Sequence, residues 1–457
     1  MKTLFFSLFL TFNFLYFSTL SGQNPDPYPP TPSPDRIVLS WVADPGHTQA
    51  VSWRTSTDVE RAWGEITLAD ASPDFPNRID TVVAETRLLQ TDLNTAHYHS
   101  VNFTGLDPGK MYMYRVGNGI QYSEWFQFKT ADKKSQGFSF LYFGDAQNDL
   151  KSMWSRAIRQ GYSTAPNIDF MLHAGDLINR PTRDNEWGEW FYAGGWIFGM
   201  KASIATPGNH EYYSEGDQYL LANHWKPSFA FPENGPEGHE ETVYFLDYQN
   251  TRFISLNTPM AKSSPASLEA QKAWLDATLR ENPNKWTIVT LHHPIYSTAG
   301  TRDNPEIREA FQPLFEQYHV DLVLQGHDHT YGRGFNKQYG SGFKDRGPVY
   351  VVSVSGPKMY TLNFDPWLDY TASNTQLYQI ISVKDNQLVY DAYTVTGDRY
   401  DGFILKKQKN GNNRFLDTAP YGQEERIEIP AVYRSRMSPE DIQLYRKKFQ
   451  TYKDRKK

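Results

Sequence analysis

The chain has 457 residues, a formal net charge of −6 and a pI near 6.1. This length allows two or three domains with buried cores, and the slightly acidic balance provides no global basic field, so we expect no nucleic-acid partner. Aromatic residues make up 15% of the chain, which is unlike the composition of disordered proteins. Cysteine is absent, so any bound metal would be held by oxygen and nitrogen ligands, which favour Mn, Fe or Zn.

Residues 1–22 have the layout of a secretory signal peptide. Lys2 is followed by an apolar run over residues 4–17 and then by small residues. The alternative is an uncleaved membrane anchor, but this run is short for a span of about 20 apolar residues, and it contains Asn13. We therefore predict an exported protein, in the periplasm, at the cell surface or outside the cell, with no stable membrane insertion after cleavage.

Residues 23–35 are dense in proline and are expected to form an extended linker. Residues 36–131 then show short segments in which apolar and polar residues alternate between turn signals. These segments cover residues 37–42, 49–55, 63–68, 98–103, 111–117 and 123–130. The pattern predicts an all-β sandwich of the immunoglobulin or fibronectin class, and residues 106–117 resemble the tyrosine-containing strand of fibronectin type III domains.

From residue 138 to residue 405, apolar strand segments alternate with helical segments. Strands are expected within 138–145, 169–176, 251–257, 286–293 and 320–329, helices over 152–161, 267–282 and 306–318, and further strands within 347–356, 375–383 and 387–395. The alternation predicts an α/β domain with largely buried strands. Residues 406–457 form a polar, basic C-terminal tail with a helix expected from Met437, a composition typical of a solvated face.

Five short motifs, each placed after a strand-like run, carry the candidate chemistry. They are GDAQ (Gly144–Gln147), GDLIN (Gly175–Asn179), GNHE (Gly208–Glu211), LHHP (Leu291–Pro294) and GHDH (Gly326–His329). Loops that follow the strands of an α/β sheet converge on one crevice, so these motifs can meet in space. Each motif supplies Asp, Asn or His, the ligands of divalent and trivalent ions. The five motifs together indicate a site assembled from five loops.

These motifs resemble the five blocks of the calcineurin-like metallophosphoesterases, GDxG, GDxxY, GNHE, VxxH and GHxH, with VTLH at Val289–His292. The most similar branch is the purple acid phosphatases, which carry a fibronectin-like domain ahead of the catalytic domain. The resemblance covers residues 36–405 and implies a four-layer α-β-β-α catalytic domain. It also implies an enzyme that hydrolyses small-molecule phosphate monoesters.

Carried over position by position, the family pattern implies two metal ions about 3.5 Å apart. The implied ligands are Asp145 and His329 for the first metal, Asn209, His292 and His327 for the second, and Asp176 as the bridge between them. Two cations would neutralise phosphate oxygens and acidify a bound water, and the resulting hydroxide would attack phosphorus. His210 would stand beside the phosphate, where it would steady the transition state or protonate the leaving oxygen.

Two positions depart from the purple branch. Its second block ends in tyrosine, whose charge transfer to iron gives the colour, and Asn179 stands there in this chain. Its first block ends in glycine, where this chain has Gln147; in many other metallophosphoesterases that position is a metal-binding histidine. We therefore predict a protein that is not purple, in which the Gln147 side-chain oxygen binds the first metal. The alternative is that Gln147 only hydrogen-bonds a metal-bound water, with Asn179 as a partner outside the ligand set.

Two other functions stay open at this point. The same metals would serve a phosphodiesterase or a nucleotide pyrophosphatase, and a non-catalytic binding protein would use the sandwich domain alone. Among the neighbouring residues, Glu211 and Asp328 are expected to orient ligands. His293 fits substrate contact and a structural role equally well.

Overall fold

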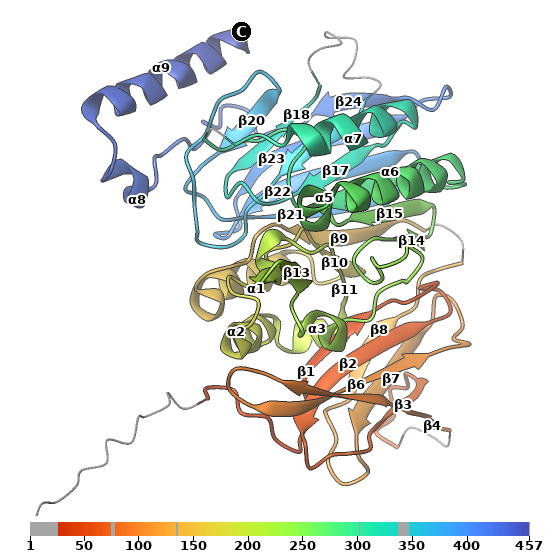
Figure 1. Ribbon diagram of the computed structural model, residues 1–457. Helices are drawn as coiled ribbons and strands as arrows, with labels where there is room; N and C mark the ends of the chain where they lie inside the picture. The colour runs from red at the N-terminus through yellow and green to blue at the C-terminus, as the bar shows by residue number, and fades with distance from the viewer. Residues whose placement is uncertain (1–25, 75–77, 134–135, 301, 337–346, 457) are drawn as a thin grey trace, which may run out of the picture.

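The computed structural model describes residues 26–74, 78–133, 136–300, 302–336 and 347–456. The predicted signal peptide and the start of the predicted linker lie outside the described residues. Within these ranges, no helix has both the length and the apolar character needed to cross a membrane. An all-β domain is followed by an α/β domain, which confirms the predicted fold class, and the two are stacked one above the other in Figure 1.

The N-terminal domain is a sandwich of two antiparallel four-stranded sheets. The first sheet has the order β1 (Asp35–Ser40), β2 (Gln49–Ser56), β6 (Thr95–Phe103) and β5 (Glu85–Gln90). The second has the order β4 (Asp80–Val83), β3 (Trp63–Leu68), β7 (Met111–Gly117) and β8 (Phe126–Lys129). Alternate residues face the core, such as Val51 and Trp53 of β2 and Tyr112 and Tyr114 of β7. The Tyr112 hydroxyl accepts a 2.9 Å hydrogen bond from the backbone N–H of Asp107, as in the tyrosine corner of such sandwiches.

The α/β domain contains two seven-stranded sheets. The first has the order β11 (Ala202–Ala205), β10 (Phe170–His173), β9 (Phe138–Phe143), β21 (Leu377–Lys384), β22 (Gln387–Thr394), β23 (Arg399–Lys407) and β24 (Asn413–Asp417). The second has the order β14 (Tyr244–Tyr248), β15 (Thr251–Leu256), β16 (Trp286–Leu291), β17 (Leu322–Gln325), β19 (Val349–Val352), β18 (Tyr331–Gly334) and β20 (Leu368–Ala372). Strands β9, β10 and β11 run parallel, as do β15, β16, β17 and β19. Because parallel strands end at the same edge, each sheet presents several strand ends together.

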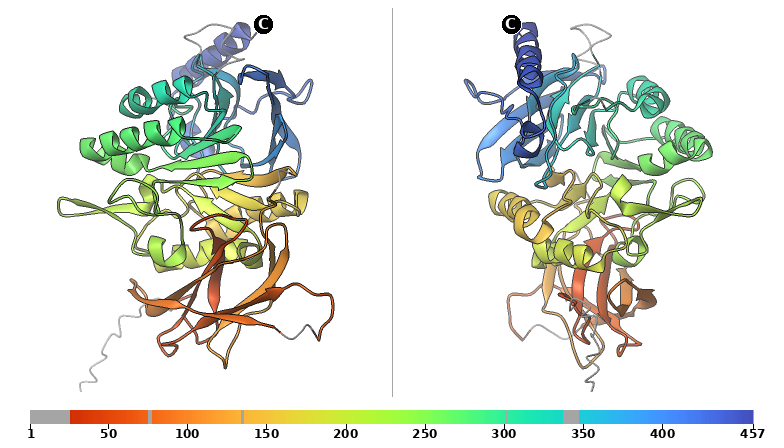
Figure 2. Two further views of the ribbon diagram at one scale, coloured as in Figure 1. Left: turned by 90° about the vertical axis from the view of Figure 1, so that its right-hand side faces the viewer. Right: turned by 60° about the vertical axis from the view of Figure 1, so that its left-hand side comes forward.

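The two sheets pack face to face, and helices cover their outer faces (Figure 2). Along β9, Phe140 and Tyr142 face the other sheet, whereas Leu141 and Phe143 pack in the cluster that contains α1. Val323 of β17 packs in a third cluster with residues of α6 and α7. The layers are therefore α-β-β-α.

Helical elements connect the strands of this domain. They are a π-helical turn at Leu150–Trp154, α1 (Ser155–Thr164), α2 (Asp184–Gly194), α3 (Trp196–Met200), a 3-10 turn at Asn209–Glu211, α4 (Trp225–Ser228), α5 (Thr258–Ser263), α6 (Pro265–Arg280) and α7 (Pro305–Gln317). Strands β12 (Tyr212–Glu215) and β13 (Gln218–Leu221) form a separate hairpin.

The chain beyond residue 405 first completes the edge of the first seven-stranded sheet. Strand β23 runs to Lys407, and β24 pairs with it as far as Asp417. Two helices follow, α8 (Ala431–Arg434) and α9 (Pro439–Arg455), at the end of the molecule away from the N-terminal domain (Figure 1). Tyr445 and Tyr452 of α9 are buried, with ring centroids 5.0 and 5.8 Å from that of Phe364. The basic helix expected from Met437 is therefore docked along one face.

Candidate metal centre

The five sequence motifs lie at the carboxyl ends of parallel strands. GDAQ follows β9, GDLIN follows β10 and GNHE follows β11 in the first sheet, whereas LHHP extends from the end of β16 and GHDH follows β17 in the second. Because the sheets pack face to face, these loops meet between them. All eight predicted site residues are brought together there: Asp145, Gln147, Asp176, Asn209, His210, His292, His327 and His329.

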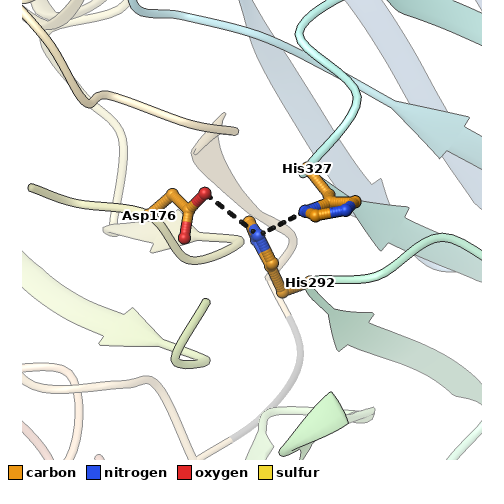
Figure 3. A group of neighbouring side chains, drawn as sticks. All are labelled: Asp176, His292 and His327. Atoms are coloured by element: carbon orange, nitrogen blue, oxygen red, sulfur yellow. Dashed lines mark hydrogen bonds and ion pairs between the residues drawn. The ribbon is translucent and has the colours of Figure 1, made fainter. Parts of the chain in front are cut away.

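One group of possible ligands contains Asp176, His292 and His327, whose side chains point toward one another in Figure 3. Nε2 of His292 lies 3.2 Å from Oδ2 of Asp176 and 3.2 Å from Nδ1 of His327. The same nitrogen lies 3.1 Å from Oδ1 of Asn209. Three candidate ligand atoms therefore lie within 3.2 Å of a fourth, close enough for one ion to contact all of them.

A second group contains Asp145, Asp176 and His329, and Gln147 adjoins it. Nε2 of His329 is 3.7 Å from Oδ1 of Asp145. The amide nitrogen of Gln147 lies 2.8 Å from the same Nε2 and 3.1 Å from Oδ2 of Asp176. In each group the candidate ligand atoms lie within 4.8 Å of one another. Asp176 is common to both groups, so it occupies the place that a bridging carboxylate would need.

The backbone at four of these residues is in the left-handed region. The φ angles are 38° at Asp145, 52° at Asp176, 74° at His327 and 47° at His329. Such φ values are uncommon outside glycine and cost free energy, and they cluster at functional sites. The adjacent glycines fit the same crowding, because a Cβ at Gly326 would lie 2.6 Å from Oδ2 of Asp145.

Backbone carbonyls orient two of the histidines. Nδ1 of His292 donates to the carbonyl of Ala174 at 2.9 Å, and Nδ1 of His329 donates to the carbonyl of Lys358 at 2.9 Å. Because a carbonyl only accepts, Nδ1 of each ring carries a proton, so Nε2 is the nitrogen that can bind a metal once it is deprotonated. This arrangement is typical of metal-binding histidines.

The carboxylate of Glu211 ties two of the loops together. It accepts hydrogen bonds from the backbone N–H groups of Asp176 at 2.8 Å, Leu177 at 2.7 Å and Gly208 at 2.6 Å. It faces the backbone of the Asp176 loop, as its expected orienting role requires. Asp328 likewise accepts from the backbone N–H of Thr298 at 2.7 Å.

The other histidines near the centre differ in exposure. His210 is half-buried, its backbone N–H donates to Oδ1 of Asp176 at 2.9 Å, and its Nδ1 donates to the carbonyl of Asn179 at 2.6 Å. His293 is buried, contacts the hydroxyl of Thr258 at 3.0 Å and packs 4.3 Å from the His327 ring. Of these two histidines, only His210 combines partial exposure with a ring nitrogen, Nε2, that the backbone does not hold.

The buried carboxylates and imidazoles of the site perturb one another's pKa values. Burial and the charge of Asp176 raise the pKa of Asp145, against the opposing effect of His292. Burial lowers the pKa of His292, but the carboxylates of Asp176 and Asp145 outweigh it and raise that pKa to about 9. Oε1 of Gln147 is buried without a hydrogen-bond partner. A set of carboxylate, imidazole and amide groups with an unpartnered oxygen fits bound metal ions.

Three residues beside the centre lie outside the five motifs, and sequence analysis did not identify them. Arg302, Lys358 and Tyr360 come from the segment after LHHP and from the loop after β19. The ring of Tyr360 lies 4.7 Å from that of His329. No spacing rule links these residues to the five motifs; the only hint is that SGPKMY, residues 355–360, begins at the end of a predicted strand.

Two family models match the chain. Residues 138–331 match the calcineurin-like phosphoesterase model, and residues 34–130 match the purple acid phosphatase N-terminal domain model. Acid phosphatase type 7 of Mus musculus is 28% identical over 363 residues, which cover 71% of this chain and 78% of the mouse protein. Purple acid phosphatase 21 of Arabidopsis thaliana is 27% identical over 270 residues, covering 58% and 59%.

Solved structures agree with this fold. Purple acid phosphatase PPD1 from yellow lupin (Lupinus luteus) seeds superposes with a TM-score of 0.70 at 18% identity, covering 83% of this chain and 75% of the lupin chain. The structure titled PhoD has a TM-score of 0.62 at 14% identity, covering 95% and 100%. At these identities the likeness concerns the fold alone. The chain thus joins a segment that matches the purple acid phosphatase N-terminal domain to one that matches the calcineurin-like phosphoesterase domain, and these matches indicate a phosphatase.

Proposed function

We propose that the protein is an exported phosphatase that hydrolyses small-molecule phosphate monoesters with two bound metal ions. The observation that carries the proposal is the pair of ligand groups that have Asp176 in common. Two adjacent ions would supply positive charge for the phosphate oxygens and would acidify a coordinated water. The acid phosphatases among the relatives support a monoester as substrate.

The residues divide between the two ions by their contacts. Asp145, Gln147 and His329 would hold the first ion, and Asn209, His292 and His327 the second, with Asp176 between them. Gln147 is included because rotation of its amide by half a turn would place Oε1 where Nε2 now lies, beside Asp176 and His329. Because the chain has no cysteine, the ligands are oxygen and nitrogen atoms, a set that favours Fe, Mn or Zn.

His210 is the candidate proton donor. Its Nδ1–H is fixed by the carbonyl of Asn179, so Nε2 is the atom that gains or loses a proton. Its backbone N–H is fixed on the Asp176 carboxylate. The imidazolium would donate its Nε2 proton to the leaving oxygen as the P–O bond breaks.

The proposal that the protein is exported rests on the apolar run of residues 4–17, and this run lies outside the described residues. Asn179 in place of the tyrosine implies that the iron-loaded protein has no iron–tyrosinate band. A visible spectrum of protein loaded with iron checks this point, because such a band would contradict it directly.

The function is tested by metal analysis and by two substrates. Purified protein is loaded with Mn, Fe or Zn, its metal content is measured, and its kcat/KM is compared for p-nitrophenyl phosphate and bis-p-nitrophenyl phosphate. We expect two ions per chain and faster hydrolysis of the monoester. A preference of about tenfold or more for the diester, a difference of about 1.4 kcal/mol in transition-state stabilisation, would favour a phosphodiesterase. Less than one ion per chain with no hydrolysis would favour a binding protein.

A further inference from the structure

The loop SGPKMY, residues 355–360, is braced against the candidate metal centre. The backbone N–H groups of Ser355 and Gly356 donate to the carbonyls of Gly144 and Asp145 at 2.7 and 2.8 Å. A Cβ at Gly356 would lie 2.6 Å from the carbonyl oxygen of Asp145, so only glycine allows this approach. The loop also receives Nδ1–H of His329 on the carbonyl of Lys358. It therefore holds Lys358 and Tyr360 at a fixed place beside the ligands.

Lys358 brings an ammonium group that no carboxylate of the described residues neutralises by direct contact. The charges that act on it are Asp176, Asp145 and Arg302, and its Nζ lies 5.7 Å from the centroid of the Tyr360 ring. The side chain is half-buried. With cations bound to Asp145 and Asp176, those carboxylates would no longer balance the ammonium. The ammonium would then attract an anion bound beside it.

Arg302 places a second positive charge beside the ring of Tyr360. Its guanidinium carbon lies 4.7 Å from the Tyr360 centroid, and its Nη1 donates to the carbonyl of His327 at 2.9 Å. The nearest carboxylate is that of Asp328, 3.6 Å away, and the side chain is 36% exposed. Arginine has five N–H donors, so this anchored guanidinium keeps donors for an incoming anion.

A tyrosine of the C-terminal segment packs against the Tyr360 ring. The Tyr433 ring of α8 lies 5.9 Å from the Tyr360 ring at an interplanar angle of 88°. Tyr360 in turn lies against His329. Both cations therefore lie near the Tyr360 ring, which packs against a candidate metal ligand.

We propose that Lys358 and Arg302 bind a second phosphate group of the substrate, next to the phosphate that is hydrolysed. This inference rests on the proposed function. Two bound metal ions would neutralise the reacting phosphate, so two further cationic side chains beside them match a substrate with additional negative charge. Arginine and lysine are the side chains that bind phosphate groups in proteins. Substrates with a second phosphate are therefore hydrolysed in preference to matched monophosphates.

The second phosphate has two possible sources, a phosphoanhydride or a separate ester on the same molecule. In both, the oxygen of water forms a bond to the reacting phosphorus and the bond from phosphorus to the leaving oxygen breaks. The electron pair leaves with that oxygen, which takes up a proton if it is an alkoxide. Orthophosphate and the remaining phosphate compound are released, and no further reactant is needed.

Matched substrates distinguish these sources. We compare kcat/KM for ADP against AMP and for fructose 1,6-bisphosphate against fructose 6-phosphate, with the metal-loaded enzyme. We expect a preference of about tenfold or more for the doubly phosphorylated member of at least one pair. In Lys358→Met and Arg302→Met that preference falls at least fivefold, whereas Lys358→Arg keeps most of it. Lys129→Met, at an exposed position in the N-terminal domain, serves as the matched control.

Binding gives a readout that does not depend on turnover. Calorimetric titration with methylenediphosphonate and methylphosphonate is expected to show tighter binding of the diphosphonate, and Lys358→Met is expected to remove most of the difference. Metal content after titration is checked for chelation, and circular dichroism confirms that each variant is folded. Equal binding of both phosphonates by the wild type, or an unchanged ratio in both methionine variants, overturns the inference. If p-nitrophenyl phosphate is not hydrolysed at all, the proposed function fails separately, and the titration still decides the subsite.

Discussion

Gln147 shows how a single amide can stand at the point where two ligand groups meet. It is fully buried, and its side chain contacts both Asp176 and His329. Its Oε1 has no partner, and a buried acceptor left unpaired costs about 1–3 kcal/mol. With the amide rotated by half a turn, this oxygen would face Asp176 and His329, where a bound ion would give it a partner.

Gln147→Ala is therefore expected to weaken the first metal site. Loss of a metal-orienting or ligand group commonly lowers affinity or activity by about 10–100-fold. We expect the metal content to fall from two ions toward one per chain and kcat/KM to fall by at least about tenfold. Elemental analysis after dialysis and p-nitrophenyl phosphate kinetics check both, with Gln160→Ala on α1 as control. Unchanged content and rate would show that Gln147 is only a loop residue.

His210 can be separated from the ligands by the same pair of measurements. It contacts Asp176 through its backbone N–H rather than its ring, so a side-chain change leaves the metal ligands in place. We expect His210→Gln to keep two ions per chain while kcat falls by about 10²-fold, the usual contribution of general acid–base catalysis. His239→Gln, in a loop of the same domain, is the control. A large loss of metal in His210→Gln would make this histidine a ligand instead of a proton donor.

At the scale of elements, helix α9 shows how a charged segment is held on the enzyme. Tyr445, Phe449 and Tyr452 recur at a spacing that places them on one face of a helix, and all three rings lie within 5.8 Å of the Phe364 ring, centroid to centroid. The N-terminus of the helix is closed by a capping box between Ser438 and Asp441. The basic residues occupy the remaining, solvated faces.

Tyr452→Ala is expected to loosen α9. Removal of a buried aromatic side chain typically costs about 3–5 kcal/mol, and Tyr452 also donates a hydrogen bond to Glu425. We expect amide hydrogen exchange in α9 to accelerate by at least about 100-fold, since about 2.7 kcal/mol corresponds to that factor in the opening equilibrium. Lys447→Ala, on the exposed face, should leave the exchange unchanged. Equal protection in both variants would mean that other contacts hold the helix.

At the scale of the whole molecule, the two domains are joined through a buried carboxylate. Asp184 of α2 accepts from both terminal nitrogens of Arg36 of β1, at 2.7 and 2.8 Å, and from Asn94 at 3.1 Å. His224 lies 3.0 Å away. Burial raises the pKa of Asp184, but the hydrogen bond from His224 and the charge of Arg36 outweigh it, so the pKa is lowered below that of an ordinary aspartate.

This interface predicts an acid-sensitive contribution to stability. The unfolded chain has the higher pKa, about 3.9, so stability from Asp184 is present above that pH and is lost as the pH falls toward the folded pKa. Asp184→Asn leaves Arg36 buried without its partner and is expected to cost about 3–5 kcal/mol at pH 7. The difference from wild type should shrink at pH 3.5. Urea unfolding at both pH values measures it, and a difference that does not change with pH would contradict the assignment.

Sequence patterns determined the parts of this protein that depend on neighbours along the chain. The buried strands before the five motifs are apolar runs in the sequence and were predicted as strands. The motifs at their ends contain all eight residues that meet at the centre. Strands β4 and β5 were not predicted. Most of their side chains are exposed, so they lack the alternation of apolar and polar residues that marks a half-buried strand.

Only the tertiary structure decided what depends on partners far away in the chain. Strand β18 reads YGRG, yet it is fully buried, because Arg333 pairs with Asp401 at 2.8 Å across the second domain. Lys358 and Arg302 have no spacing relation to the motifs and reach the centre through a braced loop and a carbonyl contact. Local sequence sets the propensity and the ligand types, whereas long-range packing sets which charges meet at the site.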